Sequence, residues 1–218
     1  MFRAFFFARS PEQERSRKLI RDVCGMDYLV FCRDRPDTGE LLASLLERHW
    51  SFMDGYADRL KARGPTLSAD GEEHTGSLHI VDLAIPEEVE VFAYREPFYA
   101  AGAYADVMIR RWENLLDRSM WDYRTDSDDP MFLVIAHAGA PIAEIADMHR
   151  SFAARHLSRT VVYGSMRMPE GGEWAGFAAV LQMPSREDVE KIVADDPVIT
   201  SSAIAHHEIH RWEMGGRR

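Results

Sequence analysis

The chain repeats itself at an interval of one hundred residues. Residues 49–113 return as residues 149–213, and 18 of the 65 aligned positions are identical. Average residue usage would give on the order of 4 matches by chance. We therefore expect two copies of one structural unit, since the matches fall on residues with structural roles. They include His49/His149, Gly64/Gly164, Gly71/Gly171, Gly76/Gly176, Pro97/Pro197 and the two Arg-Trp-Glu segments that end at Glu113 and Glu213.

Local patterns predict the same order of elements in both copies. Short β-prone apolar runs predict strands, and apolar positions at helical spacing predict helices. In the first copy, strands are expected at residues 28–32, from 66, 76–84 and 104–112, with helices at 40–63 (ended by Gly64-Pro65) and 86–97. In the second copy, strands are expected at 132–136, 161–164, 176–183 and 204–212, with helices at 142–159 and 185–197. Each copy is one β-α-β-β-α-β unit of the ferredoxin-like type.

The domain boundaries are expected where this pattern stops. Residues 1–26 precede the first unit and form an N-terminal extension, in which Ser10-Pro11 resembles a helix start. The first domain spans residues 27–116, and the polar, acidic segment 117–130 is a linker. The second domain spans residues 131–218.

The fold class expected from this organisation is α+β. A lone four-stranded ferredoxin-like sheet has helices on one face only, so its other face must be covered. Two units in one chain can cover each other sheet to sheet. We therefore expect an intrachain pair that resembles a dimeric α/β barrel, and the sequence leaves a further homodimer open.

The net charge, the N-terminal segment and the cysteines indicate which partners and which cell compartment to expect. The net charge is −10, which argues against a nucleic-acid surface and against docking on anionic membranes. The apolar run at the start, Phe5 to Phe7, is too short for a secretory signal or a membrane span. Cys24 and Cys32 are expected to be buried thiols rather than a disulfide. These features indicate a cytoplasmic protein.

Several short segments resemble the YciI-like (YCII-related) proteins. The resemblance covers about residues 27–113 and, more weakly, 131–213. It implies a dimeric α/β-barrel fold and an active-site pocket with a histidine and an acidic partner. A few relatives are dehydrochlorinases of chlorinated aromatic compounds. The segments are the run from Tyr28 to Pro36, Arg48-His49, Gly64-Pro65, Gly76-Ser77 and Glu96-Pro97-Phe98.

The family's helix histidine corresponds to His49 and, in the second half, to His149. The family's Asp-Pro-aromatic signature falls on Glu96-Pro97-Phe98 and on Asp196-Pro197-Val198. Both copies depart from it, since the first has Glu for Asp and the second has Val for the aromatic residue. The second half also has Phe177 where the first has Ser77.

His49 is the candidate general base, because imidazole titrates near neutral pH. A carboxylate would fix its tautomer, and Asp54, Asp58 and Glu96 are the candidates. Ser77, Phe98 and Tyr104 are expected to contact a substrate, as are His149 and Asp196 in the second half. The alternative is that both histidines only pack in the core, as most histidines on apolar helix faces do.

The histidines near the C-terminus suggest a metal at first sight. His206, Glu208 and His210 share one face of the last predicted strand. The first half has Asp106, Met108 and Arg110 at these positions, so a solvated polar face is favoured over a metal site. For the same reason, no metal is expected. Glycine-rich phosphate loops and nucleophile-elbow motifs are absent from the sequence, so no nucleotide or other cofactor is expected either.

The leading hypothesis is a cofactor-independent lyase or isomerase that acts on a small organic molecule. His49 would be the base, and Ser77 with nearby backbone N–H groups would hold a developing oxyanion. The competing hypotheses are a non-catalytic module that binds a small ligand or a partner, and a metal-dependent oxygenase or hydrolase. Because Asp54, Asp58 and Ser77 are not repeated, a single working site is expected in the first copy.

Overall fold

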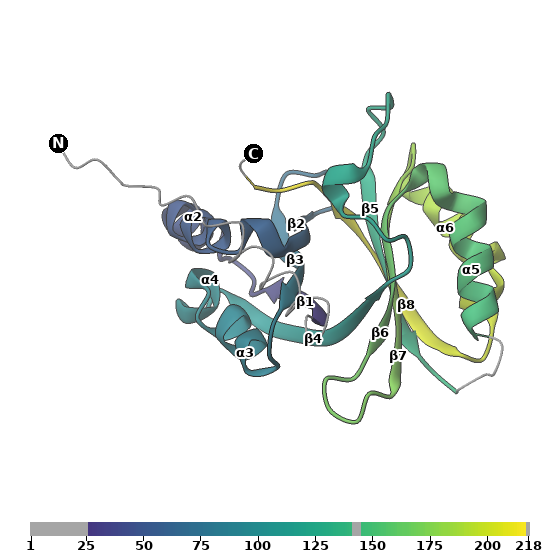
Figure 1. The fold of residues 1–218 in the computed structure, drawn as a ribbon. Coiled ribbons are helices and arrows are strands. Elements are labelled where there is room, and N and C mark those ends of the chain that lie inside the picture. Colours follow the sequence, from purple (N-terminus) through teal and green to yellow (C-terminus); the bar gives the residue numbers. More distant parts are fainter. Residues whose placement is uncertain (1–25, 141–144, 217–218) are drawn as a thin grey trace, which may run out of the picture.

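The computed structural model describes residues 26–140 and 145–216. Two sets of strands carry their helices on opposite outer sides (Figure 1). The predicted N-terminal helix, Phe5 to Phe7 and Cys24 lie outside the described residues.

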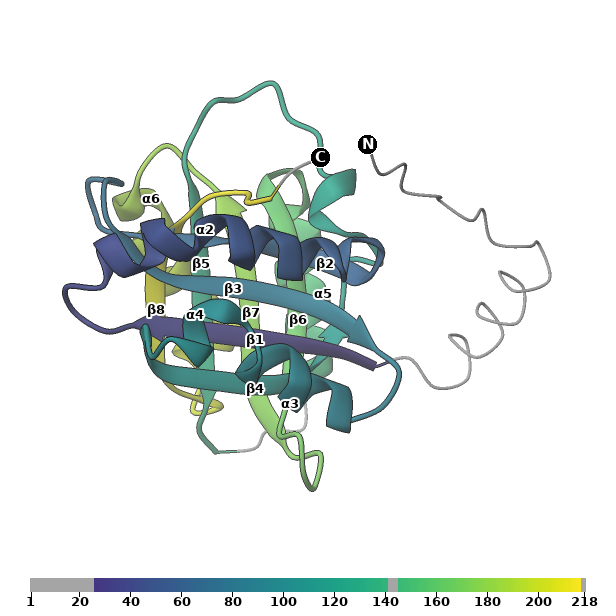
Figure 2. The same cartoon turned by 90° about the vertical axis from the view of Figure 1, so that its left-hand side faces the viewer.

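The first half contains four strands and three helices. The strands are β1 (Met26–Asp34), β2 (Leu60–Leu67), β3 (His74–Leu83) and β4 (Tyr104–Asn114). The helices are α2 (Gly39–Asp54), α3 (Glu87–Tyr94) and α4 (Pro97–Ala100). Together these helices cover one face of the sheet (Figure 2).

The second half has the same order of elements. Its strands are β5 (Met131–Ala138), β6 (Thr160–Arg167), β7 (Trp174–Gln182) and β8 (Ile204–Trp212). Its helices are α5 (Ile145–His156), α6 (Arg186–Asp195) and α7 (Pro197–Thr200). The α+β class expected from the sequence is confirmed.

All eight strands form one closed antiparallel barrel in the order β1-β3-β2-β8-β5-β7-β6-β4. The seam between β2 and β8 pairs Thr66 with Trp212, and the seam between β4 and β6 pairs Trp112 with Met166. A closed barrel leaves no open sheet edge, which removes the tendency of unpaired strands to associate.

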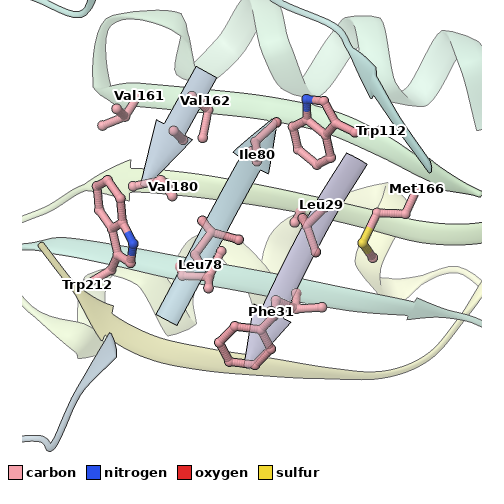
Figure 3. Packing of buried hydrophobic residues seen from close by; sticks show 14 of the residues in the cluster. Leu29, Phe31, Leu78, Ile80, Trp112, Val161, Val162, Met166, Val180 and Trp212 are labelled. Atoms are coloured by element: carbon pink, nitrogen blue, oxygen red, sulfur yellow. The ribbon is translucent and has the colours of Figure 1, made fainter. Parts of the chain in front are cut away.

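An apolar cluster fills the inside of the barrel. Leu29 and Phe31 of β1 share this cluster with Met166 of β6 and Val180 of β7 (Figure 3). Two further clusters lie outside it, one between each sheet and its helices. The alternation of inward and outward residues along the strands therefore gives each strand two buried faces.

The repeated tryptophans lie inside the barrel. Trp112 and Trp212 are in the central cluster, one at each seam. A Cβ added at Gly164 would lie 2.3 Å from the Trp112 ring, and one added at Gly64 would lie 3.0 Å from that of Trp212. Glu113, which follows Trp112, lies 3.8 Å from Arg167 across the seam.

Two predicted helix boundaries are wrong. The first long helix ends at Asp54, and Gly64 and Pro65 lie inside β2 instead of ending that helix. Pro97 begins α4, because its missing N–H costs nothing at a first helical position. The segment expected to be a polar linker places Met120 and Tyr123 in the central cluster, so it is part of the core.

Candidate functional site

His49 lies on the buried face of α2. Leu42, His49 and Met53 are spaced seven and four residues apart, which places them on the helix face that packs on the sheet. The imidazole is 11% exposed and stacks on the Phe98 ring at 4.2 Å between centroids. Helix α2 and short α4 therefore hold the ring in one plane.

Glu96 is the carboxylate partner of His49. Its Oε1 lies 2.5 Å from His49 Nδ1. The same carboxylate accepts hydrogen bonds from the backbone N–H groups of Phe98, at 3.0 Å, and Tyr99, at 2.9 Å, because Glu96 is the N-cap of α4. An ionised carboxylate only accepts, so Nδ1 carries the proton and Nε2 keeps its lone pair. Within the described part of the chain, the ring makes no other hydrogen bond.

The two other predicted carboxylates lie elsewhere. Asp54 is exposed, and its Oδ1 is 3.5 Å from the Arg63 guanidinium. Asp58 is exposed in the 3-10 turn Ala57–Arg59 and makes contacts of its own. Of the three candidates, Glu96 is therefore the one that the fold brings to His49.

A second histidine–carboxylate pair lies near the first. His74 Nδ1 is 2.5 Å from Asp34 Oδ2, and His74 Nε2 is 3.5 Å from Ser77 Oγ. A bulge explains this set: Thr66 pairs with Gly76 and Leu67 with His74, so Thr75 is an extra residue in β3. The extra residue turns His74 to the same face as Ser77. His74 also meets the Phe98 ring edge-on, at 6.4 Å.

Three more polar side chains are buried under the helices. Burial raises the pKa of Cys32, with a contribution from the Glu96 charge, and burial raises the pKa of Tyr104. Burial also holds the pKa of His79 well below its usual value. All three groups are therefore uncharged at neutral pH.

Two buried oxygens in this cluster have no hydrogen-bond partner among the described residues. They are Asp34 Oδ1 and the Tyr104 hydroxyl. Unsatisfied buried polar atoms are costly and rare in folded proteins.

Sequence reasoning missed Asp34, His74, Cys32 and His79. The sequence did contain a signal for His79. It lies two residues after Ser77 on the third predicted strand, so both polar side chains share a face that is otherwise apolar. The pairing of His74 with Asp34 gave no such signal, since it depends on a bulge and on residues 40 positions apart.

His149 of the second half has a different hydrogen-bond partner from His49. His149 Nδ1 contacts the hydroxyl of Tyr163, and its Nε2 is buried without a partner among the described residues. Asp196 caps α7 and lies 2.5 Å from Arg155, so its carboxylate is occupied. Burial lowers the pKa of His149 to about 4, against an opposing effect of the Asp196 charge.

The polar cluster of the first half is also replaced in the second. Strand pairing defines the corresponding positions, since Cys32 pairs with Ser77 as Ala136 pairs with Phe177. At the positions of Cys32, Asp34, Ser77, His79 and Tyr104, the second half has Ala136, Ala138, Phe177, Ala179 and Ile204. Among the described residues, these five polar groups of the first half therefore have no polar counterparts in the second.

A cavity of about 450 Å³ opens beside this cluster. Arg35, Tyr94 and Tyr99 line it, together with Tyr104. The rings of Tyr94 and Tyr99 are 4.9 Å apart, and Arg35 Nε donates to the Tyr104 carbonyl. Tyr104 thus belongs to both the cavity wall and the buried cluster, whereas His49 and Glu96 do not line the cavity.

Sequence comparison places the first half among known proteins. Residues 26–113 match the model of the YCII-related domain. An uncharacterized protein of Haemophilus influenzae is 28% identical over 97 residues, which cover 41% of this chain and 99% of that protein. No helix within residues 26–140 and 145–216 is long and apolar enough to cross a membrane.

Structural comparison gives two kinds of neighbour. The 5-chloro-2-hydroxyhydroquinone dehydrochlorinase of Burkholderia phenoliruptrix is 28% identical, with a TM-score of 0.39, and the match covers 40% of this chain and 94% of that one. A chlorite dismutase variant from Candidatus Nitrospira defluvii matches at a TM-score of 0.56 with 10% identity, over 86% of this chain and 90% of that one. The second likeness concerns the fold alone. Residues 26–113 therefore belong to the YCII-related domain family.

Proposed function

We propose that the chain is a cofactor-independent lyase or isomerase that acts on a small organic molecule at the His49–Glu96 pair. The observation that supports it is the hydrogen bond from His49 Nδ1 to Glu96, which leaves Nε2 as the basic nitrogen. Glu96 is itself held by two backbone N–H groups, so the carboxylate that orients the ring is fixed in place. An oriented imidazole of this kind is suited to removing a proton from carbon or oxygen.

The second histidine–carboxylate pair fits the same proposal. Isomerisation removes a proton from one atom and delivers a proton to another, whereas elimination of chloride removes a proton while the chloride leaves as an anion. In an isomerisation, His74, with Asp34 on its Nδ1, would handle the second proton, close to the Ser77 hydroxyl. Ser77 and Tyr104 would hold the oxygen on which negative charge develops.

The cavity supports an alternative, a non-catalytic module that binds a small ligand. Its lining of Arg35, Tyr94 and Tyr99 offers a cation and two aromatic rings, and it lacks His49. In that case the tyrosines and the arginine would carry the binding and His49 would only pack. We also propose that residues 131–218 form a second YCII-like domain and that the chain forms a homodimer.

Turnover by a His49→Gln variant separates the two functions. The first compound to try is 5-chloro-2-hydroxyhydroquinone, which the name of the Burkholderia enzyme specifies, with release of chloride as the readout. A panel of related small enols and phenols follows. Loss of a general base lowers the rate by about 10²- to 10⁴-fold. Turnover that His49→Gln leaves unchanged would contradict the lyase proposal, and binding without turnover that depends on Arg35 would support the alternative.

A further inference from the structure

A second polar cluster lies inside one end of the barrel. It sits where β1 and β5 end and where β4 and β8 begin. The inward-facing rows of these strands pass from apolar residues such as Phe31 and Ile135 to charged ones. The polar members at this end are Arg33, Asp106, His137, His206, Glu208 and His210.

His137 and His206 form a pair across two strands. They are directly opposite each other in the β5–β8 ladder, so their side chains leave the sheet on the same face. Their rings are 4.3 Å apart and nearly parallel, at 11°. Two imidazoles held side by side in this way present their nitrogens in the same direction.

Glu208 completes the set. It lies two residues after His206 on the same strand face, and its Oε1 is 2.6 Å from His137 Nε2. The ligand atoms of His137, His206 and Glu208 all lie within 4.8 Å of one another. His210 is close enough to reach the other carboxylate oxygen, at 3.2 Å.

We propose that His137, His206 and Glu208 form a binding site for a divalent transition-metal ion of the Zn²⁺ class. Imidazole nitrogens with one carboxylate are ligands that suit zinc and its neighbours, and Ca²⁺ and Mg²⁺ prefer oxygen alone. Three protein ligands leave at least one position open for water. Side-chain movements of about one ångström would bring the three ligand atoms to a common ion.

Arg33 is the internal competitor for this ion. Its guanidinium contacts Glu208 at 2.7 Å and Asp106 at 2.8 Å. Asp106 gives Arg33 a second carboxylate, so Glu208 can turn to a metal while Arg33 stays paired. Metal binding would then weaken an ion pair that joins β1 of the first half to β8 of the second.

The site belongs to the second half only. The strand positions that correspond to His137, His206 and Glu208 in the first half are Arg33, Asp106 and Met108. The sequence alone favoured a solvated face, because the first half has Asp106, Met108 and Arg110 at the positions of His206, Glu208 and His210. His137 was missed, since it is 71 residues from Glu208 and only the barrel brings the two together.

Calorimetric titration of the untagged full chain with ZnCl₂, after removal of metal by a chelator, tests the site. We expect one ion bound per chain. His137→Ala and His206→Ala should each weaken binding by at least about tenfold. The matched control is His207→Ala, since His207 is an exposed histidine on the other face of the same strand, and it should bind as the parent does.

Arg33→Met supplies an independent arm. It removes the competing cation and leaves all three ligands in place, so we expect tighter zinc binding than in the parent. Circular dichroism melting of each variant checks that it is folded. Absence of zinc binding to the parent overturns the proposal, as does an equal loss in His207→Ala, or binding that neither ligand variant weakens.

Discussion

At the scale of single residues, the two repeated histidines differ in their partners. His49 has a carboxylate on Nδ1, in a cluster that also contains Ser77 and Tyr104. His149 has the Tyr163 hydroxyl on Nδ1 and the Phe177 ring beside it. The same residue type at the same place in the fold therefore has a carboxylate partner in one half and a hydroxyl partner in the other.

The identity of the carboxylate partner can be tested directly. Glu96→Gln removes the charge that holds His49 Nδ1 protonated, and we expect kcat to fall by about 100-fold or more. Asp54→Asn should leave kcat unchanged, because Asp54 is exposed and lies near Arg63 instead. Equal effects of the two substitutions on turnover would show that the geometry around His49 has been wrongly assigned.

The buried His149 makes stability depend on pH. Its folded-state pKa is about 4, below the usual value of 6.5, so the fold favours the neutral ring. The stabilisation is complete above the unfolded pKa and is lost as pH falls from about 6.5 toward 4. At about 1.4 kcal/mol per pH unit, this loss amounts to roughly 2–3 kcal/mol between pH 7.5 and 4.5.

Urea unfolding at pH 7.5 and pH 4.5 measures how much the free energy of unfolding depends on the protonation of His149. In His149→Gln the difference between the two pH values should be smaller by that amount, since glutamine does not titrate. His79 also makes the parent and the His149→Gln variant less stable at low pH, because burial lowers its pKa in both proteins. An unchanged pH difference in the variant would mean that His149 titrates normally.

At the scale of elements, the repeated glycines and tryptophans form the two seams of the barrel. Gly164 of β6 approaches Trp112 of β4, and Gly64 of β2 approaches Trp212 of β8. A side chain at either glycine would collide with the facing strand as well, since the added Cβ would lie 2.6 Å or less from a backbone oxygen of Glu113 or Glu213. The close approach of two strands, more than turn geometry, explains why glycine recurs there.

Gly164→Ala should therefore be destabilising by about 1–3 kcal/mol or more, because the Trp112 ring must move. Gly39→Ala is the matched control. It begins α2 with nothing within 4 Å of the added Cβ, so stability should stay equal or rise by up to about 1 kcal/mol. Thermal unfolding of both variants gives the comparison, and equal melting temperatures would contradict the assigned packing of the seam.

The element order could be predicted from the sequence because strand and helix periodicities are local signals. The end of α2 could not, since residues 60–63 continue a helical pattern and only pairing with β3 makes them a strand. The pair His49–Glu96 was among the predicted sets because both lie on recognisable motifs. His74–Asp34 and His137–Glu208 were not, since each depends on strand register between distant residues.

At the scale of the whole molecule, each half covers the inner sheet face of the other and pairs with its edge strands. The apolar residues on the inner face of each sheet pack in one cluster with those of the other sheet, together with Met120 and Tyr123. Residues 26–116 expressed alone would expose Leu29, Phe31 and Leu78, and the edges of β2 and β4 would be unpaired. We expect this fragment to form a dimer in light scattering coupled to size exclusion. A folded monomer would contradict the covering role of the second half.

The most direct measurement of the central claim compares turnover in the two histidine variants under one assay. The claim is that the working site lies in the first half, at His49 and Glu96. The first compound found to be converted is assayed with the parent, His49→Gln and His149→Gln, each confirmed to be folded at neutral pH. The account predicts a loss of about 10²-fold or more in kcat for His49→Gln and a change of less than about threefold for His149→Gln. The reverse pattern, or an equal loss in both variants, would contradict it.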